Sequence, residues 1–388
     1  MSEIKVNSIK GVNSTDAAIT INNSDGTCTA NITNNLSNRN KIYNGKMDVD
    51  QRNSGSSVTL PNNLTTYVVD RFSVQPVNMD EATNMTAQQV SDSPDGFAHS
   101  LKVTTNTAES SIASNEFVSV YQKMEGQDFQ DLAYNTSGAK DITMSFYVKS
   151  SITGTFSFTV YRDEPGTDRI VNKTYTINSA NTWERKVITI AGDTGRAIQN
   201  TNGSVWWNIW HLAAGSDYDS TISSGWQNYA TTNWAGGHAQ DGVVTTAGAT
   251  WQITGVQLET NSVATDFEHR PFGQELSLCQ RYFYQINGNN GDISISGGFL
   301  NASEFFVLVD FPVTMRATPS YTGSATAFRM VGGADSGSKN LNNLGLWGTG
   351  LPTNIALIVS STSGGTAGHS GAIQFQANNG FLQFSAEL

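Results

Sequence analysis

In the stretch WQITGVQLETNSVATDFEHRPFGQELSLCQRYF, residues 251–283, the spacing of apolar residues changes from that of a strand to that of a helix, and this change indicates the domain organisation. Its first residues alternate apolar and polar side chains with a period of two, which is typical of a strand with one buried face. A charged turn follows, and the segment QELSLCQRYF then brings Leu276, Cys279 and Phe283 near one face of a short helix. We therefore expect one β-domain to end here and a linking helix at residues 271–285 to join it to a second domain.

Segments with the same period of two occupy most of the chain on both sides of this stretch. Before it they include TTYVVDRFSV, NEFVSVYQKMEG, DITMSFYVKSS, GTFSFTVYRDE and NTWERKVITI. After it they include NASEFFVLVDF, TNIALIVSSTS and GAIQFQANNGFLQF, in which the Asn-Asn-Gly at residues 378–380 predicts a hairpin turn. The pattern predicts an all-β fold with an antiparallel β-sandwich at residues 46–270, a bulge near Gly255, and a second, smaller β-sandwich at residues 286–388.

Residues 1–45 differ from the rest because they contain only short alternating pieces, such as IKVNSI and AAITIN, with few large apolar groups. Pieces this short cannot bury enough apolar area alone to offset the entropy lost when they become ordered. Two interpretations stay open. The segment is extended and pairs with copies of itself or with a docking partner, or it is a flexible tail.

Composition and charge exclude several classes of partner. Only 14 % of the 388 residues are charged, and the formal net charge is −11, so no basic face can offset a phosphate backbone and we expect no nucleic-acid partner. The sequence has no run of about 18 consecutive apolar residues, so we expect no membrane insertion. Solubility must rest on hydroxyl, amide and backbone groups instead.

Residues 204–242 hold the densest group of aromatic side chains. Trp206 and Trp210 share one strand face and are predicted to be core, while Trp207 lies on the other face. The long polar loop that follows is the place where binding residues are expected, because aromatic faces stack on the C–H faces of sugar rings and loops carry binding function. The candidate glycan contacts are Trp226, Tyr229, Trp234, His238 and Asp241. The competing interpretation is that these aromatic residues only attach a long loop to the sandwich.

Catalytic patterns are not found in the sequence. The five histidines are scattered without zinc-type spacing, and no serine elbow between a strand and a helix occurs, so we expect no enzyme, no metal and no cofactor. Glycan cleavage is the less favoured alternative, because two acids across a groove cannot be recognised from sequence. Cys28 and Cys279 lie far apart, and Cys279 is interpreted as a small buried apolar residue.

Several segments, in this order, resemble a known family. They are YNGKMDVDQRNSG, TYVVDRF, DITMSFYVKSSITGTFSFTVY, YTINSANTWERKVITIAGD, the stretch at 251–283 and FPVTMRATPSYT. The chain from residue 42 onward is similar to tail-fibre and related receptor-facing proteins of tailed bacteriophages, especially those of marine bacteria. The resemblance implies a central jelly roll like a carbohydrate-binding module, a homotrimer, a β-rich tip and an N-terminal segment that attaches to other virion proteins.

The expected function is therefore that of a trimeric tail fibre exposed on the surface of the virion, which binds host-surface glycan without catalysis. In such a trimer Leu276, Cys279 and Phe283 are the candidate contacts between subunits, although the helix can equally pack only within its own chain. The alternative is a capsid-bound decoration or head-fibre protein with mainly an assembly role. A glycan depolymerase is the third possibility.

Overall fold

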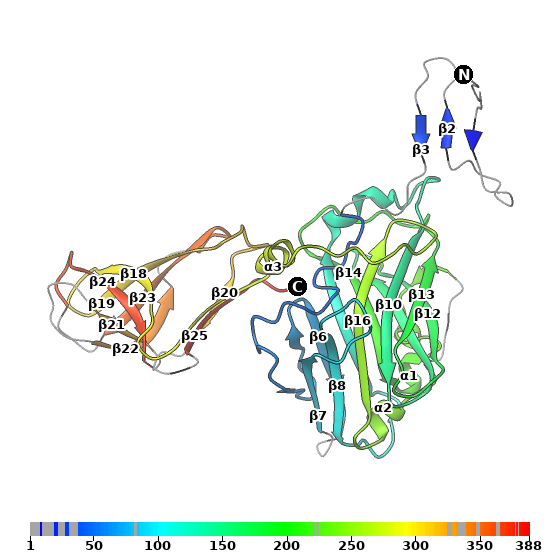
Figure 1. Ribbon diagram of the computed structural model, residues 1–388, viewed down its shortest axis with the longest axis horizontal. Helices are drawn as coiled ribbons and strands as arrows, with labels where there is room; N and C mark the ends of the chain where they lie inside the picture. Colours follow the sequence, from blue (N-terminus) through cyan, green and yellow to red (C-terminus); the bar gives the residue numbers. More distant parts are fainter. Residues whose placement is uncertain are drawn as a thin grey trace, which may run out of the picture.

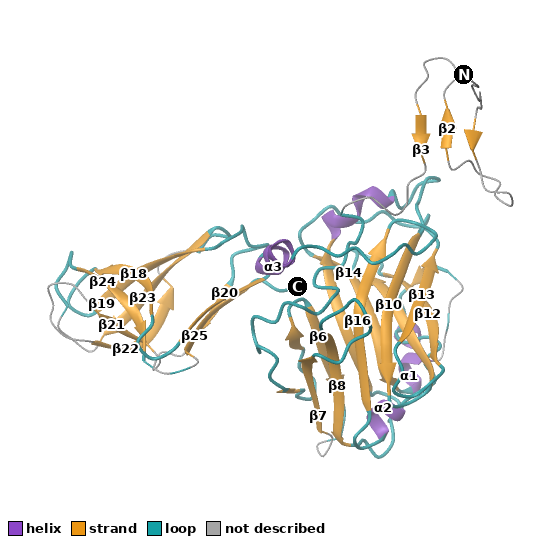
Figure 2. Cartoon of the chain, in the orientation of Figure 1, coloured by secondary structure: helices purple, strands orange, loops and turns teal. Residues whose placement is uncertain are grey.

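The computed structural model describes residues 8–9, 19–21, 28–30, 38–80, 84–219, 222, 225–323, 328–331, 339–346, 350–361, 365–376, 378 and 380–388. Strands dominate these residues, as Figure 2 shows, so the predicted all-β class is confirmed. A large jelly roll and a smaller β-unit lie on either side of helix α3 (Phe272–Gln280), and three short strands project from the jelly roll (Figure 1). No helix among the described residues has the length and hydropathy that a membrane-spanning segment needs.

The jelly roll consists of two antiparallel sheets, and the chain crosses between them several times. The six-stranded sheet has the order β13-β10-β16-β8-β7-β4, and the seven-stranded sheet has the order β15-β12-β11-β14-β9-β6-β5. The strands of the first sheet are β4 (Val58–Thr59), β7 (Asn84–Val90), β8 (Ser100–Thr107), β10 (Ile142–Ser150), β13 (Glu184–Ile190) and β16 (Thr250–Glu259). Those of the second are β5 (Thr66–Val69), β6 (Phe72–Val77), β9 (Phe117–Glu125), β11 (Gly154–Arg162), β12 (Arg169–Ile177), β14 (Ser204–Ala214) and β15 (Gln227–Asn228). Short helical turns lie at Gly126–Leu132, Ser216–Asp219, Thr231–Asn233 and Gly242–Thr245.

The core of the jelly roll follows from the alternation read in the sequence. In β10, Phe146 is fully buried between the sheets while Tyr147 points outward and is only half-buried. Trp206 and Trp210 are both fully buried, which confirms their prediction as core. Trp206 stacks on Phe129 with the ring centroids 4.2 Å apart. Large aromatic side chains of this kind supply much of the apolar area that stabilises a sandwich.

Gly255 forms the predicted irregularity in β16. The register between β10 and β16 shifts between Ser145 and Tyr147, and Gly255 has a φ of +61°, in the left-handed region that favours glycine. A Cβ atom at Gly255 would lie 2.8 Å from the ring of Phe97 and 2.9 Å from that of Tyr147. Glycine therefore lets two aromatic rings lie directly on the outer face of the sheet.

The smaller unit has the expected strands, but the structure refines the expected sandwich. Six strands close into a barrel in the order β18-β19-β23-β22-β21-β24, and β17, β25 and β20 form a separate three-stranded sheet. The barrel strands are β18 (Ile293–Phe299), β19 (Glu304–Asp310), β21 (Phe328–Val331), β22 (Lys339–Leu346), β23 (Asn354–Ser361) and β24 (Ser370–Phe375). The sheet strands are β17 (Phe283–Gly288), β20 (Ser320–Gly323) and β25 (Gly380–Ser385).

The hairpin predicted at residues 378–380 is wrong, and Asn379 lies outside the described residues. Strand β24 pairs with β18 and β21, whereas β25 pairs with β17 and β20, so the two strands do not pair with each other. Both strands run antiparallel to the segment β17–β18, with Gln374 opposite Ile293 and Gly380 opposite Gly288, so β25 follows β24 without a hairpin and runs along β17 toward α3 (Figure 1). The C-terminus consequently lies at the junction between the two units.

Part of the expected N-terminal segment belongs to the jelly roll. The strands β1 (Ser8–Ile9), β2 (Ile19–Ile21) and β3 (Cys28–Ala30) form a small antiparallel sheet that stands apart from the jelly roll in Figure 1. By contrast, residues 38–45 pack against β16, where the backbone N–H of Lys41 donates to the carbonyl of Leu258 at 2.8 Å. Ile42 is fully buried there.

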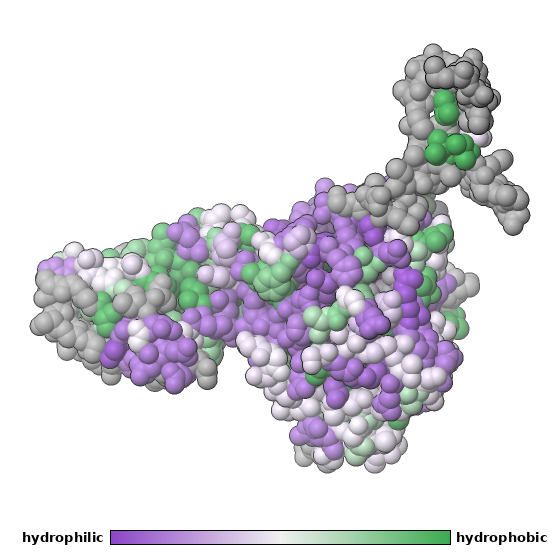
Figure 3. All heavy atoms as spheres, in the orientation of Figure 1, coloured by the Kyte–Doolittle hydropathy of each residue, from purple (hydrophilic) through white to green (hydrophobic). Residues whose placement is uncertain are grey.

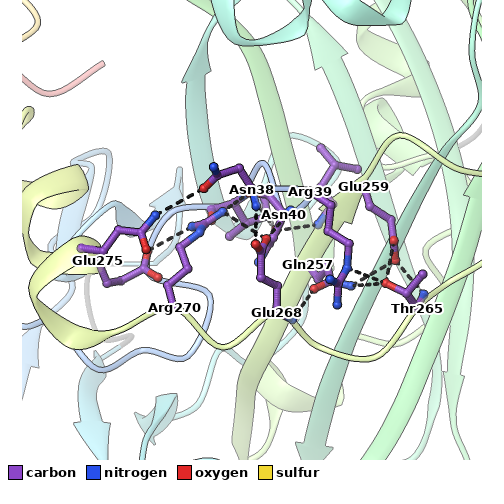
Figure 4. Close-up of polar contacts among 12 residues, drawn as sticks. Asn38, Arg39, Asn40, Gln257, Glu259, Thr265, Glu268, Arg270 and Glu275 are labelled. Atoms are coloured by element: carbon purple, nitrogen blue, oxygen red, sulfur yellow. Dashed lines mark hydrogen bonds and ion pairs between the residues drawn. The ribbon is translucent and has the colours of Figure 1, made fainter. Parts of the chain in front are cut away.

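The charged turn after β16 forms a largely buried polar network with this N-terminal segment (Figure 4). Glu268 accepts a hydrogen bond from the backbone N–H of Asn40 at 2.8 Å, and Arg270 donates to the carbonyl of Ile42 at 2.8 Å. Arg270 also lies 3.4 Å from Glu275 in α3. Glu268 and Arg270 are bonded to the N-terminal segment, and Arg270 also contacts Glu275. These contacts hold the N-terminal end of α3 against the jelly roll.

Candidate functional site

The long loop between β14 and β16 folds over the outer face of the seven-stranded sheet. Trp234 of this loop is only 8 % exposed; its ring packs edge-on against Tyr161 at 5.4 Å and Trp207 at 6.2 Å, and at a tilt against Phe117 at 6.2 Å. The carbonyl of Trp234 accepts a hydrogen bond from the hydroxyl of Thr159 at 3.0 Å. Trp234 therefore attaches the loop to the sheet, and no ring face is left for a sugar.

His238 and Asp241 close the same loop. The Nδ1 atom of His238 accepts a hydrogen bond from the backbone N–H of Ser157 at 3.3 Å, and its Nε2 atom lies 3.4 Å from the Asp241 carboxylate. The same carboxylate accepts from the backbone N–H of Ala214 at 3.0 Å. The side chain of His238 is 1 % exposed, so this pair fixes the loop end rather than facing solvent.

Trp226 lies at a different place, on the wall of a groove at the open edge of the sandwich. The groove has a volume of about 520 Å³ and runs between β12, which lies next to the short edge strand β15 of one sheet, and the end of β13 in the other. Trp226 is half-buried, and its indole N–H donates to the carbonyl of Ala191 at 2.8 Å. Its ring rests edge-on against Trp206 and Tyr134, at 6.0 and 5.8 Å. The tryptophan is thus held in one orientation by the core behind it.

Arg169 supplies the polar wall of this edge groove. Its Nε and Nη2 atoms donate to the two carboxylate oxygens of Asp193 at 3.0 and 2.9 Å, and Nη1 donates to Asn228 at 2.8 Å. Asp193 is itself 1 % exposed and accepts a third bond from the buried Arg162 at 2.7 Å. A guanidinium has five N–H groups, so two donors of Arg169 are not engaged in these bonds. Bidentate pairing fixes the plane in which they point.

The remaining walls carry groups of both charge signs. Lys173 and Thr189 line the groove with residues 191–195, and Asp141 accepts a hydrogen bond from the backbone N–H of Gly192 at 3.1 Å. Two cationic side chains face two carboxylates, so the groove has no net charge. An aromatic face next to fixed hydrogen-bonding groups suits a ring that is apolar on its faces and hydroxylated at its edge.

Tyr229 lies on the outer face of the seven-stranded sheet, away from the edge groove. It is 37 % exposed and packs against Tyr161 at 5.3 Å and Trp234 at 5.9 Å. Trp207 belongs to the same surface, but the ammonium group of Lys123 lies 3.8 Å from its ring and covers one face. The structure therefore separates Tyr229 from Trp226, although the two are three positions apart in the loop sequence.

Sequence reasoning missed Arg169, Lys173 and residues 191–195. Arg169 begins an ordinary alternating strand, and nothing local distinguishes it from an exposed strand residue. A long-range signal would have been needed, since only the pairing of β12 with β15 at Arg169 and Asn228 brings it beside Trp226.

The candidate subunit contacts are placed very differently from one another. Cys279 is a free thiol that is fully buried, which confirms its interpretation as a buried small residue, and Phe283 is 2 % exposed. Both are enclosed within one chain, so of the three only the half-buried Leu276 has surface left for a second chain. Burial raises the pKa of the Cys279 thiol well above its ordinary value.

One acidic group among the described residues has the spacing of metal ligands. Oxygen atoms of Asp80, Glu109 and Glu116 lie within 4.8 Å of one another. The backbone N–H of Asp80 donates to Glu109 at 3.0 Å, and that of Ala113 donates to Glu116 at 2.7 Å, so the carboxylates of Glu109 and Glu116 already have backbone donors. A hydrogen bond and charge repulsion from Glu109 raise the pKa of Asp80, and desolvation followed by repulsion raises that of Glu116. We assign no ion to this group.

Comparisons with known proteins give distant likenesses. No protein-family model and no curated protein matches the chain. Solved structures that resemble it include a family 11 carbohydrate-binding module from Clostridium thermocellum, with 9 % identity over 55 % of this chain and 98 % of that one and a TM-score of 0.27. A xylan-binding domain from Paenibacillus barcinonensis has 13 % identity over 55 % of this chain and 99 % of that one, with a TM-score of 0.26.

The enzymatically active domain of a tailspike protein from bacteriophage CBA120 has 12 % identity and a TM-score of 0.28. The match covers 49 % of this chain and only 19 % of that one. At these identities and TM-scores none of the likenesses decides function. We therefore infer function from the edge groove and its residues.

Proposed function

We propose that the protein is a carbohydrate-binding protein without catalytic activity, and that the edge groove is its binding site. The observation that carries this proposal is a tryptophan fixed on one wall of a groove of about 520 Å³ with the rigidly paired guanidinium of Arg169 on another. Side chains that are already fixed lose little conformational entropy when a ligand binds. The free energy gained from weak contacts with a sugar is therefore not cancelled by the cost of ordering these side chains.

The charges favour a neutral glycan. Arg169 and Lys173 are balanced by Asp141 and Asp193 within the groove. The protein as a whole carries a net charge of −11, which repels polyanionic polymers at low salt, where screening is weak. In the view of Figure 3, residues of hydrophilic and intermediate hydropathy cover most of the jelly roll, and hydrophobic ones occur in small separate patches. A hydroxylated, uncharged ligand can bind to this surface without the desolvation cost of burying an unpaired charge.

A glycan array followed by calorimetry on the best ligand tests the site. We expect Trp226→Ala to weaken binding about tenfold or more, because an aromatic contact contributes about 0.5–1.5 kcal/mol beyond the area it buries. Trp226→Phe, which keeps a ring, should retain part of the affinity. Trp183→Ala is the matched control, since Trp183 is also half-buried but lies outside the groove, bonded to Asp92. Equal affinity of the Trp226→Ala and wild-type proteins would contradict the proposal.

We further propose that the chain acts as a trimeric fibre on the surface of a tailed-phage virion, which rests on the sequence resemblance. Two features support it. The chain is elongated, with two β-units in line and a small sheet projecting at the N-terminal end (Figure 1), and Ile9 of that sheet is 52 % exposed. Three copies would multiply weak glycan contacts by raising the effective concentration of the second and third sites.

Size-exclusion chromatography with light scattering checks the oligomeric state. A trimer is expected, and a monomer at micromolar concentration would contradict the fibre. Particles that lack the protein distinguish its roles: intact particles that fail to adsorb indicate receptor binding, whereas misassembled particles indicate a decoration or head-fibre role. Release of reducing ends from a bound polysaccharide would instead identify a depolymerase.

A further inference from the structure

A second groove lies between the jelly roll and the β17–β25 sheet. It has a volume of about 570 Å³, and its walls come from two parts of the chain far apart in sequence. One wall is the turn at residues 52–56, just before β4, and the other consists of side chains from β17 and β25. Unlike the edge groove, this inter-domain groove exists only while the two units are docked.

Amide side chains form a chain of hydrogen bonds on the β17–β25 wall. Gln285 and Gln383 are directly opposite each other in the pairing of the two strands, so both point to the same face. The Nε2 of Gln383 donates to Oε1 of Gln285 at 2.7 Å, and Nε2 of Gln285 donates to Oδ1 of Asn287. This directional chain leaves the Oε1 acceptor of Gln383 at one end and the Nδ2 donor of Asn287 at the other, neither bonded within the described part of the chain.

Phe381 adds an apolar ring to this wall. It is opposite Asn287 in the strand pairing, and its ring is half-buried and lines the groove. A ring face beside an amide donor and an amide acceptor matches a sugar, which has apolar ring faces and hydroxyl groups that both donate and accept.

The opposite wall is a rigid turn. The Asp50 carboxylate accepts hydrogen bonds from the backbone N–H groups of Asn53 at 2.9 Å and Gly55 at 2.7 Å. The amide nitrogen of Asn53 donates to the carbonyl of Val68 at 2.7 Å, which ties the turn to β5. The exposed hydroxyl of Ser54 lines the groove. An Asx-type turn of this kind fixes the backbone without help from a ligand.

The spacing between the two walls is fixed as well. The guanidinium of Arg52 lies 3.5 Å from the ring of Phe283 and 4.7 Å from that of Tyr67, and its Nη2 donates to Glu387 at 2.9 Å. Gln51 donates to the carbonyl of Phe283 at 2.9 Å. Because Arg52 is engaged by these partners, it forms part of the base of the groove and contributes no free charge there.

We propose that this inter-domain groove is a second carbohydrate-binding site, in which Phe381 contacts the ring face of a neutral sugar and the free ends of the Gln383–Gln285–Asn287 chain bond its hydroxyls. The proposal takes its class of ligand from the proposed function, but the site and its residues are separate from Trp226. Two sites per chain would let one chain hold two points of the same polymer.

The stoichiometry of binding tests this inference. Native mass spectrometry and calorimetry on the full-length protein would use a panel of neutral oligosaccharides, with uronic-acid oligosaccharides as the charged comparison. The wild-type protein should bind two neutral oligosaccharides per chain, and Phe381→Ala and Trp226→Ala should each weaken a different one of the two sites. At the inter-domain site we expect Phe381→Ala to bind about tenfold more weakly.

Phe272→Ala is the matched control, because Phe272 is a 56 % exposed phenylalanine outside the groove. Asn287→Ala, at an exposed position, should weaken the same site as Phe381→Ala without risk to folding. Two sites of wild-type affinity in both Phe381→Ala and Asn287→Ala would overturn the second site and leave the first intact. A wild-type protein that binds no oligosaccharide in the panel would overturn the proposed function itself.

Discussion

Replacing Glu387 by alanine is expected to destabilise the junction between the two units strongly. Glu387 is bonded to Arg71 and, at 2.9 Å, to Arg52, and the side chains of Glu387 and Arg71 are 7 % and 1 % exposed. Removing one partner of a buried ion pair leaves the other charge without compensation, which costs about 3–5 kcal/mol. Glu387→Ala should therefore lower the free energy of unfolding by about that amount, whereas Glu387→Gln, which keeps an acceptor, should cost less.

Urea unfolding followed by tryptophan fluorescence measures the effect, and small-angle scattering reports whether the units separate. Asp131→Ala is the matched control, because it removes an ion pair with Lys41 in which the Asp131 side chain is 48 % exposed. Such surface pairs contribute at most about 1 kcal/mol. If Glu387→Ala costs no more than Asp131→Ala and its scattering profile is unchanged, the ion pairs of Glu387 do not hold the junction together.

Three further outcomes are expected. Gly255→Ala should cost more stability than Gly248→Ala in thermal unfolding, because both have positive φ but only at Gly255 would the new Cβ meet aromatic rings; equal costs would contradict this. The pKa of Glu116 is raised in the folded state, so the ionised carboxylate lowers the free energy of unfolding at pH values above that pKa. The free energy of unfolding recovers as the pH falls through the folded-state pKa and Glu116 becomes protonated. Glu116→Gln should therefore raise the melting temperature at about pH 8 and lose its advantage at about pH 4; a gain that does not depend on pH would refute the electrostatic cause. In a Cys28→Ser background, Cys279 should react with a thiol reagent only after unfolding, since the folded thiol is buried; rapid labelling of the native protein would show that the site opens.

The core of the jelly roll could be predicted because it depends on local alternation. A period of two places Phe146 and Trp210 on a buried face whichever strands lie beside them. Pairing depends on distant segments instead. The Asn-Asn-Gly at residues 378–380 predicts a hairpin from local sequence, but β25 pairs with β17, which lies far earlier in the chain.

The candidate site was predictable only in part, for the same reason. Trp226 and Trp234 come from one aromatic-rich loop and look alike in the sequence. Trp234 is buried because the outer face of β14 happens to lie beneath it, whereas Trp226 remains on the wall of a groove. Which ring is covered is a property of tertiary packing, and the arginine that completes the groove comes from another strand.

The return of the C-terminus to the junction has a mechanical consequence. The smaller unit leaves the jelly roll through Arg281, whose guanidinium pairs with Glu125 at 2.7 and 2.8 Å, and comes back to it at Glu387. A pull on the far end of the barrel is therefore shared by two anchor points in parallel. A tether with one anchor swivels under load, but two anchors resist torque, so the orientation of the barrel is maintained while the molecule is under tension.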